Sequence, residues 1–182
     1  MNREASADVV VKFLSSIDHF WFALDGGWGV DALLGQQTRL HSDLDLIVLT
    51  SELLELKRHL ESIGFTRAVD SDGIVYSSDE LDVDLHQVDQ DSDGFYYFDI
   101  GDGKSWPIPP QAMNASGKIH AKRYNCLSAD MQVQCHTQGY DLQRKDVQDL
   151  LSLQKEFGCV LPLRLYRDGQ LQSGFSASLP TE

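Results

Sequence analysis

Residues 25–49, DGGWGVDALLGQQTRLHSDLDLIVL, decide the fold. They begin with the glycine pair Gly26-Gly27 and end with Asp43 and Asp45, which alternate with leucine and lead into an apolar run. Successive side chains of a strand point to opposite faces, so both carboxylates are expected on one face. Two carboxylates in one small space repel each other unless positive charge lies between them, and Mg²⁺ takes oxygen ligands. The stretch therefore predicts a magnesium site on a strand.

The glycine pair has two interpretations. It is a tight turn, or it lets backbone N–H groups approach phosphate oxygens at the start of a helix, where the helix dipole favours negative charge. Residues 28–34 form the apolar segment expected to be that helix, and Gly35 is expected to end it. No Gly-Lys-Ser/Thr follows the pair, so the stretch is not a P-loop.

A second acidic strand is predicted further along the chain. The alternating segment 81–86 places Asp82, Asp84 and His86 on one face. If this strand lies beside the first in the sheet, it brings a third carboxylate to Asp43 and Asp45, enough to hold two metal ions about 3.5–4 Å apart. Because Asp-x-Asp occurs five times in this chain, the pattern by itself is equally consistent with a solvated sheet face.

The rest of the chain alternates helical and strand patterns, which indicates an α+β fold. We expect a mixed, mostly antiparallel sheet with helices packed on it, and a small C-terminal helical part at about 128–158. Helices are predicted at 6–19, 28–34, 50–64, 128–138 and 145–157, and strands at 20–24, 43–49, 65–69, 74–77, 81–88 and 119–127. Residues 89–110 are expected to be a loop or a short hairpin. One domain would cover residues 1–166, and residues 167–182 would be a flexible tail.

Composition limits the classes of partner. The 182 residues carry a net charge of -13, from 28 acidic and 15 basic side chains. Such a chain is a poor match for nucleic acid, which requires a basic surface, but it would attract a cationic small molecule. No segment approaches the length of a membrane span, and three cysteines lack metal-finger spacing. We therefore expect a cytoplasmic protein with no nucleic-acid or membrane partner.

One further acidic segment competes as a metal site. Asp89, Asp91 and Asp93, followed by Gly94, copy the first half of a calcium-binding loop. Ile100 stands where that loop needs a bidentate glutamate, so an acidic turn is the better interpretation.

The order GGWGVD at 26–31, followed by TRLHSDLD at 38–45, resembles the nucleotidyltransferases of the DNA polymerase beta superfamily. Within that superfamily it is most similar to the small antibiotic nucleotidyltransferases of the lincosamide and aminoglycoside type. The segment VDLH at 83–86 resembles the part that carries the third acid, and 126–128 and 139–142 resemble the lincosamide branch. The resemblance covers about residues 20–166.

The resemblance implies roles for the acids and the glycines. Asp43 and Asp45 would hold magnesium, and Asp84 would complete the metal site and take the proton from the acceptor hydroxyl. Asp82 is the alternative for the base, because it shares the face of Asp84. Gly26 and Gly27 would line the triphosphate.

Three further residues are implicated by the same resemblance. Arg39 would neutralise the triphosphate, and Lys145 would reach the same phosphates from the start of the last helix. The alternative for Lys145 is an exposed lysine at a helix end. His41 would either touch the nucleotide or orient the entry into the acidic strand.

The implied activity is magnesium-dependent transfer of a nucleoside monophosphate, with ATP as the expected donor of AMP, to a hydroxyl of a small antibiotic. A lincosamide is the first expectation for the acceptor and an aminoglycoside the second. The alternatives are a minimal nucleotidyltransferase of the toxin-antitoxin type that modifies a protein or RNA, and a nucleotide-binding module without turnover. Enzymes of the family often complete their pockets as dimers, which leaves a homodimer open.

Overall fold

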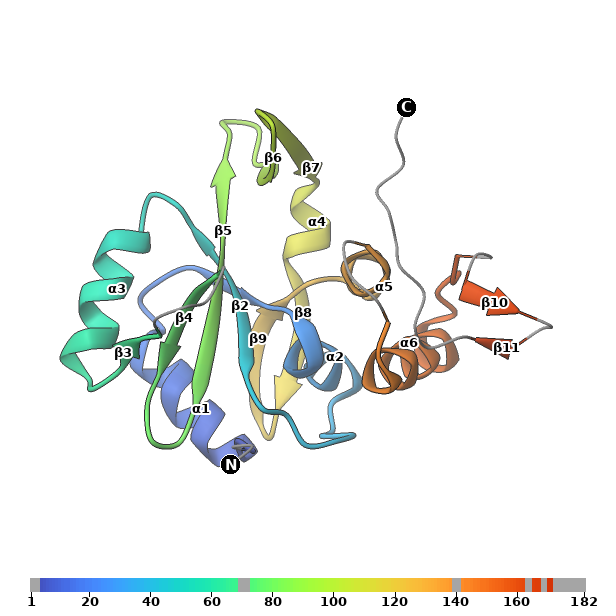
Figure 1. Cartoon of the computed structure of the whole chain (residues 1–182), viewed down its shortest axis with the longest axis horizontal. Coiled ribbons are helices and arrows are strands. Elements are labelled where there is room, and N and C mark those ends of the chain that lie inside the picture. Colours follow the sequence, from blue (N-terminus) through green and yellow to red (C-terminus); the bar gives the residue numbers. More distant parts are fainter. Residues whose placement is uncertain (1–3, 69–72, 139–141, 163–164, 168–169, 172–182) are drawn as a thin grey trace.

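The computed structural model describes residues 4–68, 73–138, 142–162, 165–167 and 170–171. These residues form the predicted α+β fold around a mixed sheet. Its strand order is β3-β4-β5-β2-β1-β9-β8 (Figure 1). A hairpin of two further strands, β6 and β7, extends from β5. The strands are β1 (Phe22–Leu24), β2 (Leu44–Leu49), β3 (Thr66–Arg67), β4 (Ile74–Ser77), β5 (Asp82–Gln90), β6 (Tyr96–Gly101), β7 (Lys104–Ile108), β8 (Ala115–Ile119) and β9 (Lys122–Cys126).

The two acidic strands lie side by side in the middle of the sheet. β2 pairs with β5 in parallel and with β1 in antiparallel orientation. β1 pairs in parallel with β9, and the remaining strand pairs of this sheet are antiparallel. The prediction of a mostly antiparallel sheet is therefore confirmed.

Different helices pack on the two faces of the sheet. They are α1 (Ala7–Ser16), α2 (Gly26–Leu34), α3 (Leu53–Ser62), α4 (Pro110–Met113), α5 (Ala129–Thr137) and α6 (Arg144–Phe157). Alternate residues of β2 enter different cores: Leu46 packs in the cluster with α1 and α3, whereas Ile47 packs in the cluster with α4 and α5. Asp45 shares the face of Ile47 because it lies two residues before it.

The C-terminal helices dock on α2, and α5 also packs on the sheet through Met131. Val30 of α2 packs with Val133 of α5 and with Leu150 and Leu153 of α6 in a separate buried cluster. Figure 1 shows α5 and α6 together beyond α2, on the side of the sheet away from α3. Because α2 is held between the sheet and these helices, the position of its first turn depends on both.

Several element boundaries differ from the predictions. α2 begins at Gly26 and not at residue 28, because the Asp25 side chain caps it by accepting from the Gly26 N–H at 2.7 Å. The helix predicted at 50–64 begins later than expected, since α3 starts at Leu53 after Glu52. Glu52 accepts a hydrogen bond from the Trp21 N–H at 2.9 Å.

The predicted single strand at 119–127 is a hairpin of β8 and β9 that turns at His120, which has φ of 53°. The missed strand β8 contains Gly117, and a Cβ there would lie 2.7 Å from Ala32 of α2, so β8 packs tightly against that helix. In contrast, the expected hairpin within 89–110 is confirmed by β6 and β7.

Near the C-terminus, Tyr166–Arg167 (β10) and Gln170–Leu171 (β11) pair as a small antiparallel sheet within the segment expected to begin the tail. Residues 172–182, and residues 139–141 of the lincosamide-like segment, lie outside the described residues. Among the residues that the structure describes, no helix is both long and apolar enough to cross a membrane.

Candidate active site

Two carboxylates from neighbouring strands meet at the centre of the sheet. The parallel register of β2 and β5 pairs Asp45 directly with Asp84, and strand alternation puts His86 on the same face. The His86 Nε2 atom lies 3.5 Å from Asp45 Oδ1 and 3.9 Å from Asp84 Oδ2. The structure thus brings together an acid from each of the two predicted strands, with a histidine between them.

Asp43 lies further from this group than expected. It precedes β2, is exposed, and lines the same pocket as Asp45. The compact group whose ligand atoms lie within 4.8 Å of one another consists of Asp45, Asp84 and His86. Asp43 still acts on the group through its charge, which helps to raise the pKa of Asp84.

Burial and charge perturb the titration of this group. Burial raises the pKa of the Asp84 carboxyl, and the nearby charges of Asp45 and Asp43 add to this shift. Burial alone would lower the pKa of His86, but the carboxylates of Asp45, Asp25 and Asp84 outweigh it and raise the pKa to about 9. The site is therefore strongly negative and attracts cations.

The donor atoms suit a hard divalent cation. Asp84 Oδ1 is buried and has no hydrogen-bond partner among the described residues. A buried oxygen of this kind requires a proton, a water molecule or a cation. Carboxylate oxygens are the ligands that Mg²⁺ prefers, so Asp45 and Asp84 could hold this ion, with Asp43 at the edge of the site.

The first glycine of the pair is packed against the acids. Gly26 has φ of +56°, and a Cβ there would lie 2.0 Å from Asp45 Oδ2. Only glycine combines this backbone conformation with such a close approach. The first turn of α2 therefore lies directly beside the carboxylate pair.

The second glycine is packed against Arg39 and His41. A Cβ on Gly27 would lie 2.4 Å from Arg39 Nη2 and 2.3 Å from His41 Nδ1. The pair is thus neither a simple turn nor an open loop, but the start of a helix on which three functional side chains converge.

A pocket of about 320 Å³ opens beside these groups. Its walls come from the start of α2, from β2 and β5, and from the C-terminal helices α5 and α6. The lining residues are Asp25, Gly26, Gly27, Arg39, Asp43, Asp45, His86, Cys135, His136, Gln143, Lys145 and Asp146. Lys145 is exposed on the first turn of α6 and lines this pocket.

His41, predicted either to touch the nucleotide or to orient the entry into the acidic strand, is buried and is not among the residues that line this pocket. Its side chain is 1% exposed, its Nε2 atom contacts Asp31 Oδ2 at 2.5 Å, and its ring packs on Trp28 with 4.7 Å between centroids. Asp31 also accepts hydrogen bonds from the backbone and hydroxyl of Thr38. These contacts tie the chain before β2 to α2, and they favour the role of His41 in orienting the entry into the acidic strand.

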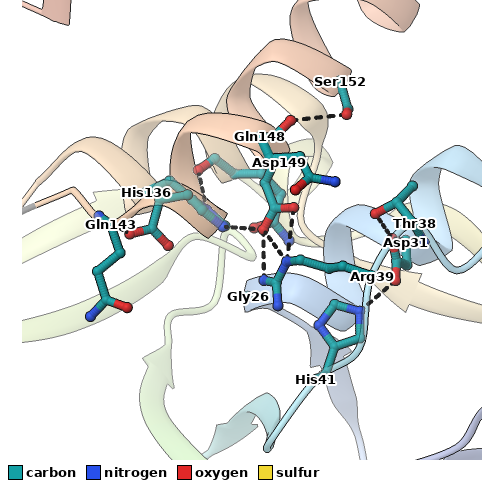
Figure 2. A network of polar contacts seen from close by, with 12 residues as sticks. Gly26, Asp31, Thr38, Arg39, His41, His136, Gln143, Gln148, Asp149 and Ser152 are labelled. Atoms are coloured by element: carbon teal, nitrogen blue, oxygen red, sulfur yellow. Dashed lines mark hydrogen bonds and ion pairs between the residues drawn. The ribbon is translucent and has the colours of Figure 1, made fainter. Parts of the chain in front are cut away.

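Arg39 lines the pocket but is already paired. Its guanidinium contacts the buried carboxylate of Asp149 on α6, with 2.7 Å between Nη2 and Oδ2 (Figure 2). The same oxygen also faces His136 of α5, whose Nε2 atom lies 3.7 Å from Oδ2. Burial alone would lower the pKa of His136, but Asp149 and Asp25 outweigh it and raise the pKa.

Three residues of the site were missed from the sequence. Asp25 caps α2 and lines the pocket, and its place directly before the glycine pair was a usable signal. Burial raises the pKa of Asp25, and Asp45 adds to the shift. His136 carried no local signal, whereas Asp149 ends the Lys-Asp-x-x-Asp pattern that begins at Lys145, which was a usable signal; its pairing with Arg39 spans 110 residues of chain and could not be read from that pattern.

The competing acidic segment is a turn, as interpreted. Asp91 Oδ1 accepts from the backbone N–H groups of Asp93 and Phe95, and Asp91 Oδ2 accepts from the Tyr97 hydroxyl at 2.8 Å. These bonds close the connection between β5 and β6.

Comparison with known proteins identifies the family of this chain. The sequence profile of the aminoglycoside-2''-adenylyltransferase family matches residues 8–153. A lincosamide resistance protein of Staphylococcus haemolyticus is 28% identical over 137 residues, which cover 74% of this chain and 83% of that protein.

Solved structures share the fold. The lincomycin-bound lincosamide antibiotic adenylyltransferase LnuA superposes with a TM-score of 0.74 at 24% identity, over 83% of this chain and 98% of that one. The antibiotic-resistance factor ANT(2'')-Ia superposes with a TM-score of 0.68 at 20% identity, over 84% of each chain. With the profile match over most of its length, the chain belongs to the aminoglycoside-2''-adenylyltransferase family of nucleotidyltransferases.

Proposed function

We propose that this enzyme transfers AMP from ATP to a hydroxyl of a small antibiotic, with a lincosamide as the first choice of acceptor and an aminoglycoside as the second. The observation that carries the proposal is the pairing of Asp45 with Asp84 across β2 and β5, directly beside the first turn of α2. Two acids beside a helix N-terminus provide the two requirements of phosphoryl-group transfer, a cation site and a phosphate-binding backbone.

Asp45 and Asp84 would hold Mg²⁺, and Asp43 would complete the site from its edge. When bound, the ion supplies positive charge to the phosphate oxygens as charge moves from the attacking to the leaving oxygen. Support for these ligands comes from the unpartnered Asp84 oxygen and from the negative charge that raises the pKa of His86.

The triphosphate would lie between the start of α2 and the start of α6. The N–H groups of the first helical turn and the helix dipole favour phosphate at Gly26 and Gly27. Arg39 and Lys145 line the same pocket and bring cationic groups to it. Most of the acceleration would then come from positioning and electrostatics.

The reaction balances as a displacement at phosphorus. The acceptor hydroxyl oxygen forms a bond to the α-phosphorus of ATP while the bond between that phosphorus and the bridging oxygen to the β-phosphate breaks. Pyrophosphate leaves, and the hydroxyl proton passes to Asp84. Burial raises the pKa of this carboxyl, which makes it a stronger base than an ordinary aspartate.

The acceptor proposal rests on charge and on the relatives. Asp25, Asp43, Asp45 and Asp146 all line the pocket, so a cationic acceptor would be attracted to it. The curated relative is named for lincosamide resistance and the matching family for aminoglycosides. The lincosamide resistance protein is 28% identical to this chain, and this relationship supports a lincosamide as the first choice of acceptor.

The test is pyrophosphate release from ATP and Mg²⁺ with lincomycin, with tobramycin and with no acceptor. The control is Asp45→Asn, which keeps the volume of the side chain and removes its charge. We expect release that depends on one antibiotic and is lost in the control. Pyrophosphate release that needs no acceptor and survives Asp45→Asn would refute the proposal. If the protein binds ATP but neither antibiotic causes pyrophosphate release, the proposed class of acceptor is refuted.

A further inference from the structure

The buried carboxylate of Asp149 is the junction between the C-terminal helices and the phosphate side of the pocket. It is 1% exposed and receives three contacts from one guanidinium, at 3.2 Å and 3.2 Å from Arg39 Nε and at 2.7 Å from Nη2. His136 approaches Oδ2 from α5. Figure 2 shows Arg39 and His136 converging on this carboxylate from two sides.

The ionisation of Asp149 depends on the positive charges of Arg39 and His136. Burial alone would raise the pKa of Asp149, but His136 and Arg39 outweigh it and lower the pKa, so the carboxylate is ionised. A buried carboxylate is tolerated only when it is paired in this way. His136 is oriented for the contact because its Nδ1 atom lies 2.9 Å from the Gln132 carbonyl, which leaves Nε2 facing Asp149.

The pairing determines where Arg39 lies. An arginine side chain is long and rotationally free, and the planar fork of its guanidinium is oriented by a two-point contact with a carboxylate. Here the contact holds Nη2 against Gly27, while Nη1 donates to the Leu40 carbonyl at 3.2 Å. The guanidinium is thereby kept at the first turn of α2, where Arg39 lines the pocket.

The first turns of α6 carry three charged side chains near this end of the pocket. In the pattern Lys-Asp-x-x-Asp at 145–149, Lys145 lines the pocket and Asp149 holds Arg39. Asp146 caps the helix by accepting from the Gln143 N–H at 2.7 Å, which defines where α6 begins. Residues three and four apart lie on the same side of a helix, so Lys145 reaches the pocket on the side of α6 where the buried Asp149, one turn further on, meets Arg39.

We infer that Asp149 is a positioning residue for nucleotide binding. It holds Arg39 beside Gly27, so that docking of α6 on α2 completes the phosphate-binding end of the pocket. This inference rests on the proposed function, because it assigns Arg39 to the triphosphate. It goes further in making the affinity for nucleotide depend on a residue of α6 that does not line the pocket.

The test measures the Kd of α,β-methylene-ATP with Mg²⁺ by calorimetry. This analogue keeps the three phosphates but cannot be cleaved between the α and β positions. For Asp149→Asn we expect a rise in Kd of roughly tenfold to a hundredfold, the size associated with one hydrogen bond to a charged group. Arg39→Ala should raise Kd by a similar factor, and the double variant should raise it no further than either single change.

Two controls separate positioning from stability. Leu153→Ala removes buried volume from the same helix one turn later, so it should lower Tm while leaving Kd unchanged. Arg39→Lys keeps the positive charge but loses the planar fork, and it should raise Kd even if Asp149→Asn fails to fold.

The outcomes are distinct. A normal Kd in Asp149→Asn or in Arg39→Lys would overturn the inference, as would tighter binding, which would mean that Asp149 competes with phosphate for Arg39. Equal losses of affinity in Asp149→Asn and Leu153→Ala would show that only stability of α6 matters. Absence of binding by the unmodified protein would overturn the proposed function, and the positioning role with it.

Discussion

The two glycines at the ends of α2 offer a matched pair of substitutions. Gly26 begins the helix with φ of +56°, and Gly35 follows its last residue with φ of +69°. Alanine at either position must adopt the left-handed conformation. The two positions differ in their surroundings, because nothing lies within 4 Å of a Cβ built on Gly35, whereas a Cβ on Gly26 lies 2.0 Å from Asp45 Oδ2.

The expected effects follow from this difference. The left-handed conformation costs an L-residue roughly 1–2 kcal/mol, so Gly35→Ala should lower the free energy of unfolding by about that amount. Gly26→Ala carries the same cost and also a displacement, because contacts under 3.0 Å essentially never occur for a real Cβ. The Asp45 carboxylate or the start of α2 must therefore move by about 1 Å, and a misplacement of that size in an active site costs on the order of 100-fold in rate.

Urea denaturation would measure the free energies of unfolding, and pyrophosphate release in the presence of the active acceptor would measure the rates. We expect Gly35→Ala to retain nearly full activity and Gly26→Ala to lose about 100-fold or more, although both lose similar backbone stability. If Gly26→Ala were as active as Gly35→Ala, the close packing of the helix start on Asp45 would have no part in catalysis, and our account of the glycine pair would be wrong.

Three further predictions concern the acids, the metal and the buried histidine. Asp84→Asn should reduce turnover by about 100-fold or more, as expected for loss of a general base, whereas Asp82→Asn, two residues away on the same face, should remain active. The reverse order in a comparison of kcat would move the base to Asp82. Chelation of divalent cations with EDTA should abolish pyrophosphate release and added Mg²⁺ should restore it, because uncompensated carboxylates at the site would repel the triphosphate; undiminished release in EDTA would contradict a metal requirement. In the folded protein the carboxylates raise the pKa of His136 above its ordinary value of 6.5, although burial alone would lower it. The protonated ring therefore stabilises the folded state fully below pH 6.5. This stabilisation is lost as the pH rises through the pKa of His136 in the folded protein. The difference in unfolding free energy between the unmodified protein and His136→Gln should therefore shrink as the pH rises above 6.5, and a constant difference in a series of urea titrations would show that the ring does not titrate in this way.

Local patterns were sufficient to predict the elements that carry the site. Strand alternation placed Asp84 and His86 on one face, and they share that face in β5. The glycine pair marked the helix that begins at the site, although its start was misplaced by two residues because the cap at Asp25 was not recognised. Whether a segment forms a helix or a strand depends largely on residues close to it in the sequence. Hydrophobic periodicity and turn residues therefore predict helices and strands well.

Tertiary structure decided which of these residues meet. The parallel register of β2 and β5 pairs Asp84 with Asp45 rather than with Asp43, and a sequence pattern contains no information on register between distant strands. Packing of the loop before β2 buries His41 beneath Gly27, and docking of α6 brings Asp149 to Arg39 across 110 residues. The sequence by itself determined the acidic strands, the helix start and the family resemblance, whereas long-range packing alone decided which charges are paired, because burial and distance depend on the whole fold.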